Sequence, residues 1–263
     1  MRNLLAIAAA AILTATTASA ENLKVGTECT YHPFNYRTDD GTLTGYDVDV
    51  ANEIAKRIGA EIEYVCQEWK GMIPALLAGK FDLIVASMSI TEKRLEQIDF
   101  SAPYRVSIGQ FVGKPELALF NGDELNPAGF EGVKIGLERA TTYEEWIRAK
   151  VPSADVAYYD SNEAMYLDLA AGRVDAIMTN PMKAYLKFLS EEGNDTFTVL
   201  GPQIAEEAYF GIGVGVGLRQ GQDDLKTRIN AALKGMTEDG TLGEFGLRYF
   251  PFTIHPQEWK GAS

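Results

Sequence analysis

The sequence has little histidine, little cysteine and a deficit of positive charge. Of its 263 residues, two are histidine and two are cysteine, and 24 Lys plus Arg stand against 37 Asp plus Glu. His32 and His255 lie far apart, with no cysteines or carboxylate clusters beside them, so we expect no metal site and no cofactor. The net charge of −13 repels phosphate backbones, and no Lys/Arg cluster offsets it, so we expect no nucleic-acid partner.

Long apolar runs are absent after the first twenty residues: none reaches the 18 residues typical of a membrane helix. Residues 1–20 have a different layout. Arg2 stands near the start, residues 4–13 are all apolar, and Ala18-Ser19-Ala20 offers small residues to a peptidase. This is the pattern of a cleaved secretory signal peptide, and no cysteine follows Ala20 to carry a lipid. We therefore expect a periplasmic protein that is soluble and unanchored.

The two cysteines, Cys29 and Cys66, would meet an oxidising compartment after export. Each comes just after one of two consecutive predicted strands, so a disulfide between them is geometrically possible. The sequence leaves open whether they pair.

Strands and helices alternate in two similar blocks. We expect strands at 23–26, 61–65, 82–85, 133–137, 156–159 and 176–178, and helices at 47–58, 72–77, 142–150, 163–171, 181–189, 224–233 and 242–249. Such alternation predicts an α/β protein with mostly parallel sheets flanked by helices. Two blocks predict two lobes with a cleft between them, and ligands of such sheets bind beyond the carboxyl ends of the strands.

The residues that follow the predicted strands suit a zwitterionic ligand. They are Glu28, Tyr31, Trp69, Ser87, Ser89 and Arg94 in the first block, and Glu138, Thr141, Thr142 and Asn180 in the second. Arg94 can hold a carboxylate through two parallel hydrogen bonds, and the N–H groups of a helix that begins at Thr142 can add to that site. Tyr31 and Trp69 can enclose a side chain, and Glu28 can pair with a cation.

Several of these residues have a purely structural alternative. Thr142 with Glu145 matches a capping box, and Asn180 before a proline matches a helix N-cap. Arg94 could pair with surface carboxylates, and Trp69 could belong to the core. Their joint placement after successive strands favours a binding site.

Four segments carry a family resemblance. Residues 45–50 (GYDVDV), 100–104 (FSAPY) and 213–219 (GVGVGLR), and above all the spacing Ser87-x-Ser89-Ile90-Thr91-x-x-Arg94, resemble periplasmic polar-amino-acid-binding proteins. The resemblance covers essentially the whole chain after residue 20. It implies the two-lobed, type II periplasmic-binding-protein fold with a hinge of two chain crossings. It further implies a receptor, monomeric by expectation, that closes around an amino acid and delivers it to the membrane permease of an ABC importer.

The resemblance also implies residue roles. Tyr31 and Trp69 match the pair that sandwiches the ligand side chain, while Ser87 and Ser89 match polar contacts from the first lobe. Arg94 and Thr141, with the N–H of Thr142, match the site of the α-carboxylate. Glu28 matches an acidic residue that faces the side-chain cation in the branch that binds lysine, arginine, ornithine and histidine.

Asn180 departs from the family pattern. Typical members hold the α-ammonium with an Asp here, and an amide cannot neutralise that charge. Either Glu138 supplies the missing charge, or the ligand has a substituted amine, as opines do. Ala86, where basic-amino-acid binders often have Ser, also departs from the pattern. We rank a cationic amino acid first and an opine-like conjugate second.

The expected boundaries place lobe 1 at 21–106 and 214–263, lobe 2 at 110–204, and the hinge crossings at 107–109 and 205–213. Some periplasmic dehydratases resemble these receptors, but Asn180 is not titratable and no Ser-His or Cys-His pairing is in view, so we expect no enzyme and no catalytic residue. A receptor that presents its ligand to a chemosensor would have the same cleft.

Overall fold

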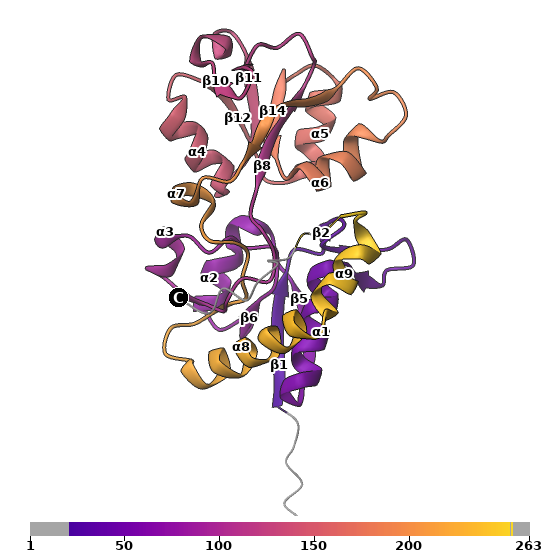
Figure 1. Ribbon diagram of the computed structural model, residues 1–263, viewed down its shortest axis with the longest axis vertical. Helices are drawn as coiled ribbons and strands as arrows, with labels where there is room; N and C mark the ends of the chain where they lie inside the picture. The colour runs from indigo at the N-terminus through magenta and orange to yellow at the C-terminus, as the bar shows by residue number, and fades with distance from the viewer. Residues whose placement is uncertain (1–20, 253, 255–263) are drawn as a thin grey trace, which may run out of the picture.

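The computed structural model describes residues 21–252 and 254. The expected signal peptide (1–20) and the end of the expected first lobe (253 and 255–263) lie outside the described residues. The chain forms two lobes, one above the other in Figure 1, each built around a five-stranded sheet. No helix in the described part of the chain has the length and apolar character that crossing a bilayer requires.

The lower lobe in Figure 1 contains a mixed sheet of strand order β5-β1-β6-β15-β7. Its strands are β1 (Glu21–Thr27), β5 (Ala60–Cys66), β6 (Leu83–Ile84), β7 (Asp99–Phe100) and β15 (Gly217–Leu218). β1 runs parallel to β5 and β6, whereas β15 runs antiparallel to β6 and β7. A small antiparallel sheet of β2 (Thr30–Tyr31), β3 (Asn35–Arg37) and β4 (Leu43–Thr44) lies beside it.

Helices cover both faces of this sheet because apolar residues alternate along its strands. Leu83 packs into a core with α1 (Tyr46–Ile58), α8 (Asp223–Glu238) and α9 (Thr241–Tyr249). Its neighbour Ile84 points to the other face and packs with α2 (Met72–Leu77). The short elements η1 (Trp69–Gly71) and α3 (Glu92–Leu95) complete the lobe.

The upper lobe repeats this plan with the strand order β12-β11-β13-β8-β14. Its strands are β8 (Gly109–Gly113), β11 (Lys134–Glu138), β12 (Asp155–Tyr159), β13 (Ala176–Thr179) and β14 (Thr198–Ile204). Met178 faces a core with α4 (Thr142–Lys150), and Ile177 faces one with α5 (Asn162–Ala170) and α6 (Pro181–Ala184). The remaining elements are the hairpin β9 (Phe120–Asn121) and β10 (Glu124–Leu125), η2 (Pro127–Phe130), the π-helical turn η3 (Tyr185–Leu189) and α7 (Glu207–Phe210).

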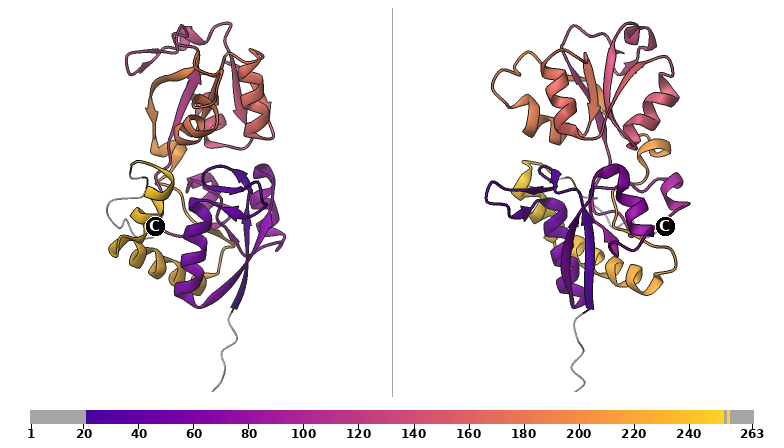
Figure 2. Two further views of the ribbon diagram at one scale, coloured as in Figure 1. Left: turned by 90° about the vertical axis from the view of Figure 1, so that its right-hand side faces the viewer. Right: turned by 180° about the vertical axis from the view of Figure 1, so that it is seen from behind.

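The observed architecture confirms the expected two-lobed α/β fold. Helices predicted at 72–77 and 142–150 coincide with α2 and α4. The predicted elements did not include β8 and β14, which pair antiparallel with each other. The single helix predicted at 181–189 is divided into α6 and η3. The chain passes from one sheet to the other between β7 and β8 and returns between β14 and β15, so two segments connect the lobes, and Figure 2 shows this junction from two further sides.

Candidate functional site

A cavity lies between the two lobes. Its lining consists of Glu28, Tyr31, Trp69, Ala86, Ser87, Ser89, Arg94, Glu138, Thr141, Thr142 and Tyr143. The first seven come from the lower lobe and the last four from the upper lobe. The free volume of about 40 Å³ leaves room for only a few water molecules. This volume is too small for a molecule the size of an amino acid in the present arrangement of the lobes.

The lining gathers ten of the eleven residues singled out in the sequence; Asn180 is the exception. Its side-chain oxygen accepts hydrogen bonds from the backbone N–H groups of Met182 and Lys183, at 3.0 and 3.2 Å. Asn180 thus caps α6, with a proline at the first helical position, as the structural alternative expected.

Arg94 is the positively charged residue of the cavity lining. It is 9% exposed, and its guanidinium donates to the backbone oxygens of Ser89 (3.0 Å) and Ala140 (3.3 Å) and stacks 5.3 Å from the Trp69 ring. Burial lowers the pKa of Arg94 to about 10, so the group stays charged at neutral pH. No carboxylate oxygen of the described residues lies within 4.0 Å of it. A buried guanidinium of this kind favours a carboxylate ligand.

The start of α4 faces the same cavity. Thr141 is the N-cap: its hydroxyl accepts from the N–H of Glu144 at 3.4 Å and donates to the carbonyl of Glu138 at 2.8 Å. The capping pair expected at Thr142 is therefore wrong by one residue, because α4 begins at Thr142 and Glu145 instead pairs with Lys93. The first N–H groups of α4 have no partners within the helix and carry its positive dipole end.

Backbone strain is concentrated around the cavity. In the described chain, the residues other than glycine with positive φ are Cys29 (65°), Ser87 (54°) and Ala140 (60°). Cys29 follows Glu28, Ser87 lines the cavity, and Ala140 precedes Thr141. Such conformations persist only where the surrounding structure holds them, and they collect at binding sites.

Asp47, in the first turn of α1, supports the lower half of the cavity from behind. This fully buried carboxylate accepts hydrogen bonds from Asn35, Ser87 and Tyr104, each at 2.8 Å. The Asn35 oxygen in turn accepts from the backbone N–H of Glu28 at 3.1 Å. Asp47 therefore positions two lining residues, which explains physically why the motif at residues 45–50 accompanies the site.

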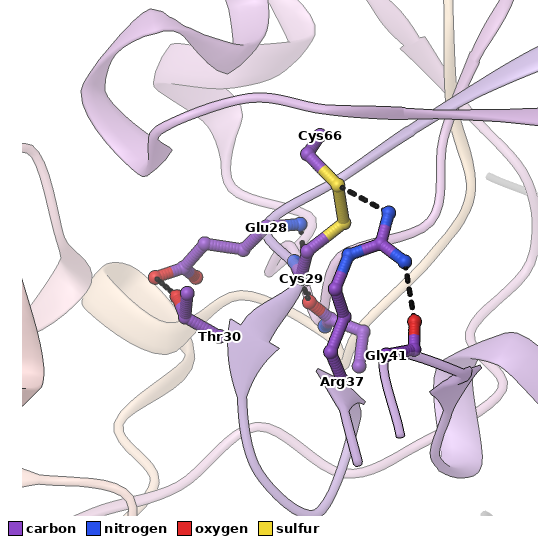
Figure 3. The surroundings of a disulfide bond; sticks show 7 residues. Glu28, Cys29, Thr30, Arg37, Gly41 and Cys66 are labelled. Carbon is purple, nitrogen blue, oxygen red and sulfur yellow. Dashed lines mark hydrogen bonds between the residues drawn. A yellow bond between two sulfur atoms is a disulfide. The ribbon is translucent and has the colours of Figure 1, made fainter. Parts of the chain in front are cut away.

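A disulfide holds the segment that carries Glu28 (Figure 3). Cys29 and Cys66 are bonded, with their Cα atoms 5.6 Å apart, so the pairing that the sequence left open is present in the structure. The bridge ties the loop after β1 to the end of β5. The Glu28 carboxylate extends away from the sulfur atoms and accepts from the Thr30 hydroxyl at 3.4 Å.

The acidic side of the cavity contains Glu28 and Glu138. One oxygen of Glu138 accepts from Asn162 at 2.7 Å, and the other is buried without a hydrogen-bond partner among the described residues. Burial, followed by the charge of Glu28, raises the pKa of Glu138 to about 8. Burial likewise raises the pKa of Glu28.

Sequence reasoning missed two residues here. Tyr143 lines the cavity from the first turn of α4. Lys183 has its ammonium 4.1 Å from the centre of the Tyr31 ring, although it belongs to the upper lobe. Lys183 could have been found from its position in the sequence: it follows Asn180 by three residues and so lies in the first turn of a helix that starts at the cleft.

Direct contacts join the lobes around the cavity. The Trp69 indole N–H donates to the Ala140 carbonyl at 3.1 Å. Two ion pairs, Lys70 with Asp160 (2.9 Å) and Lys93 with Glu145 (2.7 Å), also cross the cleft. The structure therefore has its lobes closed on one another.

Comparison with known proteins gives a consistent result. A family model described as bacterial extracellular solute-binding proteins, family 3, matches residues 23–252. The L-arginine-binding protein of Pseudomonas aeruginosa is 33% identical over 95% of this chain and 96% of its own length. The L-cystine-binding protein TcyJ of Escherichia coli is 36% identical over 87% of this chain and 82% of its own length.

A solved structure with the same fold is an ancestral amino acid-binding protein, AncCDT-1, described as a precursor of cyclohexadienyl dehydratase. It superposes with a TM-score of 0.74 at 28% sequence identity, over 87% of this chain and 95% of that one.

Proposed function

Because this chain belongs to the bacterial extracellular solute-binding proteins of family 3, we propose that it is a periplasmic receptor that binds an amino acid between its lobes and delivers it to an ABC import permease. One observation carries the proposal: the buried Arg94 guanidinium and the N-terminal turn of α4 converge on one cavity from opposite lobes. That pair of groups suits an α-carboxylate.

The other lining residues complete the proposed site. Tyr31 and Trp69 enclose the ligand side chain, and Ser87 and Ser89 supply polar contacts from the lower lobe. Glu138 takes the α-ammonium in place of the family's Asp, since Asn180 is engaged as a helix cap and one Glu138 oxygen is free of partners in the described chain.

Ligand capture requires a hinge. We propose that the crossings at 107–109 and 205–213 open and close the cleft, with lobes bounded as the sequence predicts. The small volume of the cavity and the contacts between the lobes support this, since a ligand that touches both lobes stabilises the closed state by its extra contacts there.

The names of the relatives bear on the ligand class. The relative named for L-arginine fits the expectation of a cationic amino acid. The relative named for L-cystine fits an amino acid whose side chain is not a cation.

We propose binding without catalysis. A dehydratase needs a general acid, and Glu138 with its raised pKa is the residue that could serve as one. Catalysis has to be tested because a solved structure of the same fold is described as a precursor of cyclohexadienyl dehydratase. Mass spectrometry of the bound ligand after prolonged incubation should return it unchanged; a product lighter by one water would contradict the proposal.

A thermal-shift screen tests the receptor function. The protein is unfolded, freed of bound ligand and refolded, and its melting temperature is measured with each of the twenty amino acids, ornithine, citrulline, octopine and nopaline. A ligand that binds only the folded state at 100 times its Kd adds about 2.7 kcal/mol to the free energy of unfolding. Stabilisation by an amino acid supports the proposal, and absence of any stabilisation across the panel would overturn it.

A further inference from the structure

We propose that Lys183 is a specificity-determining residue: a built-in counter-cation for Glu28 and Glu138 that adapts the cavity to an amino acid whose side chain has no positive charge. The inference rests on the proposed receptor function and narrows its ligand class.

The position of Lys183 is the first observation. Only 1% of the residue is exposed, and it stands in the first turn of α6, in the upper lobe. Its ammonium lies over the Tyr31 ring of the lower lobe at 4.1 Å and 5.9 Å from the centre of the Tyr166 ring. The side chain therefore crosses the cleft and contacts one of the two aromatic rings that enclose the proposed ligand.

The second observation is a pair of buried polar atoms without hydrogen-bond partners in the described chain. One is the Lys183 ammonium nitrogen, and the other is an oxygen of Glu138. A buried ammonium is costly unless opposite charges compensate it. The strongest opposite charges acting on Lys183 are those of Glu28 and then Glu138, and the Tyr31 ring adds a cation–π contact.

The charges around the cavity then balance. The lining carries Glu28, Glu138 and Arg94, and Lys183 stands beside it over the Tyr31 ring. The ammonium of a bound amino acid would hold Glu138 in its ionised form, so two negative groups would face two positive ones. Behind them, the buried Asp47 and Arg105 also offset each other. A zwitterionic ligand keeps this balance, with its carboxylate at Arg94 and its ammonium at Glu138, while Glu28 faces Lys183.

A cationic side chain would break the balance. It would share Glu28 with Lys183 and leave one positive charge uncompensated in a buried site, which is unfavourable. Without Lys183 the same cavity would carry one net negative charge and suit a cationic side chain. Glu28 considered alone therefore favours a cation, whereas Glu28 together with Lys183 favours a neutral side chain.

Isosteric ligands isolate the effect of charge. Citrulline matches arginine in shape but has an uncharged ureido group, and norleucine approximates lysine without its ammonium. Titration calorimetry on the refolded protein measures Kd for each pair. We expect the wild type to bind the neutral member of a pair at least tenfold more tightly. Lys183→Met should shift the ratio at least tenfold toward the cationic member.

Lys187→Met is the matched control, because Lys187 lies one turn further along and is exposed; it should leave the ratio unchanged. Tighter binding of arginine or lysine by the wild type would overturn the inference yet support the receptor function. A ratio unchanged in Lys183→Met would also overturn it. If Lys183→Met fails to fold, the inference is tested by the ratio of Kd values in the wild type and in Lys183→Gln. Failure of every amino acid to bind the wild type would overturn the receptor function and the inference together.

Discussion

The side-chain oxygen of Asn180 accepts a hydrogen bond from the backbone N–H of Lys183 at 3.2 Å. The residue expected at the ligand's ammonium is thus used to begin α6, and α6 directs Lys183 across the cleft onto Tyr31. In the proposed site, a helix cap in the upper lobe therefore determines where a cation lies relative to the ligand.

Asn180→Asp tests this assignment. Asp caps helices about as well as Asn, so we expect the start of α6 to be kept and the variant to fold like the wild type. We expect the affinity for amino acids to change less than threefold, because Asn180 is outside the cavity lining. Asn180→Ala, which removes the cap, should lower stability by about 1 kcal/mol. A tenfold gain in affinity in Asn180→Asp would instead place the residue at the ligand's ammonium.

Arg94→Ala should weaken ligand binding severely. Loss of one partner from a buried charge pair costs roughly 2–5 kcal/mol, which corresponds to a Kd raised by about thirtyfold or more. Calorimetry with the ligand found in the screen measures this. Arg173→Ala is the control, because Arg173 pairs with Asp168 at the surface and lies outside the cavity lining; it should bind normally. Near-wild-type affinity in Arg94→Ala would refute the site.

Removal of the disulfide should lower both stability and affinity. We expect the double variant Cys29→Ser/Cys66→Ser to lose about 2–4 kcal/mol in denaturant unfolding, because the bridge closes a loop between residues 37 positions apart. Ligand affinity should fall as well, since Cys29 adjoins Glu28. Dithiothreitol should destabilise the wild type and leave the double variant unaffected. Equal sensitivity of both proteins to the reductant would contradict a stabilising role for the bridge.

Glu138 should make the ligand-free protein more stable in mild acid. Its folded-state pKa of about 8 lies above the ordinary value of 4.5, so between these pH values the folded state holds a proton that the unfolded state releases. The contribution of this carboxyl is complete below pH 4.5 and is lost as pH rises toward 8, at up to about 1.4 kcal/mol per pH unit. The free energy of unfolding, measured by denaturant titration from pH 5 to 8, should therefore fall more steeply with pH for the wild type than for Glu138→Gln. Parallel curves would show that Glu138 titrates normally.

The fold was predictable in outline because apolar periodicity and helix signals are local. The strand that became β1, the helix α4 and the alternation of the two blocks follow from residues close together in the chain. β8 and β14 were not predictable in this way. β8 pairs antiparallel with both β13 and β14 across long sequence separations, and β14 is irregular between Leu200 and Ile204.

Much of the cavity lining was predictable from local sequence, because residues that follow parallel strands meet at one edge of a sheet. Glu28, Tyr31 and Arg94 could be named for this reason. The position of Lys183, by contrast, depends on the tertiary structure. Lys183 reaches Tyr31 and the Glu28 region only because the second lobe folds over the first, and no local pattern relates residues about 150 positions apart. Electrostatic interactions depend on distance in space, so only the folded arrangement of the two lobes lets Glu28 and Glu138 act on Lys183.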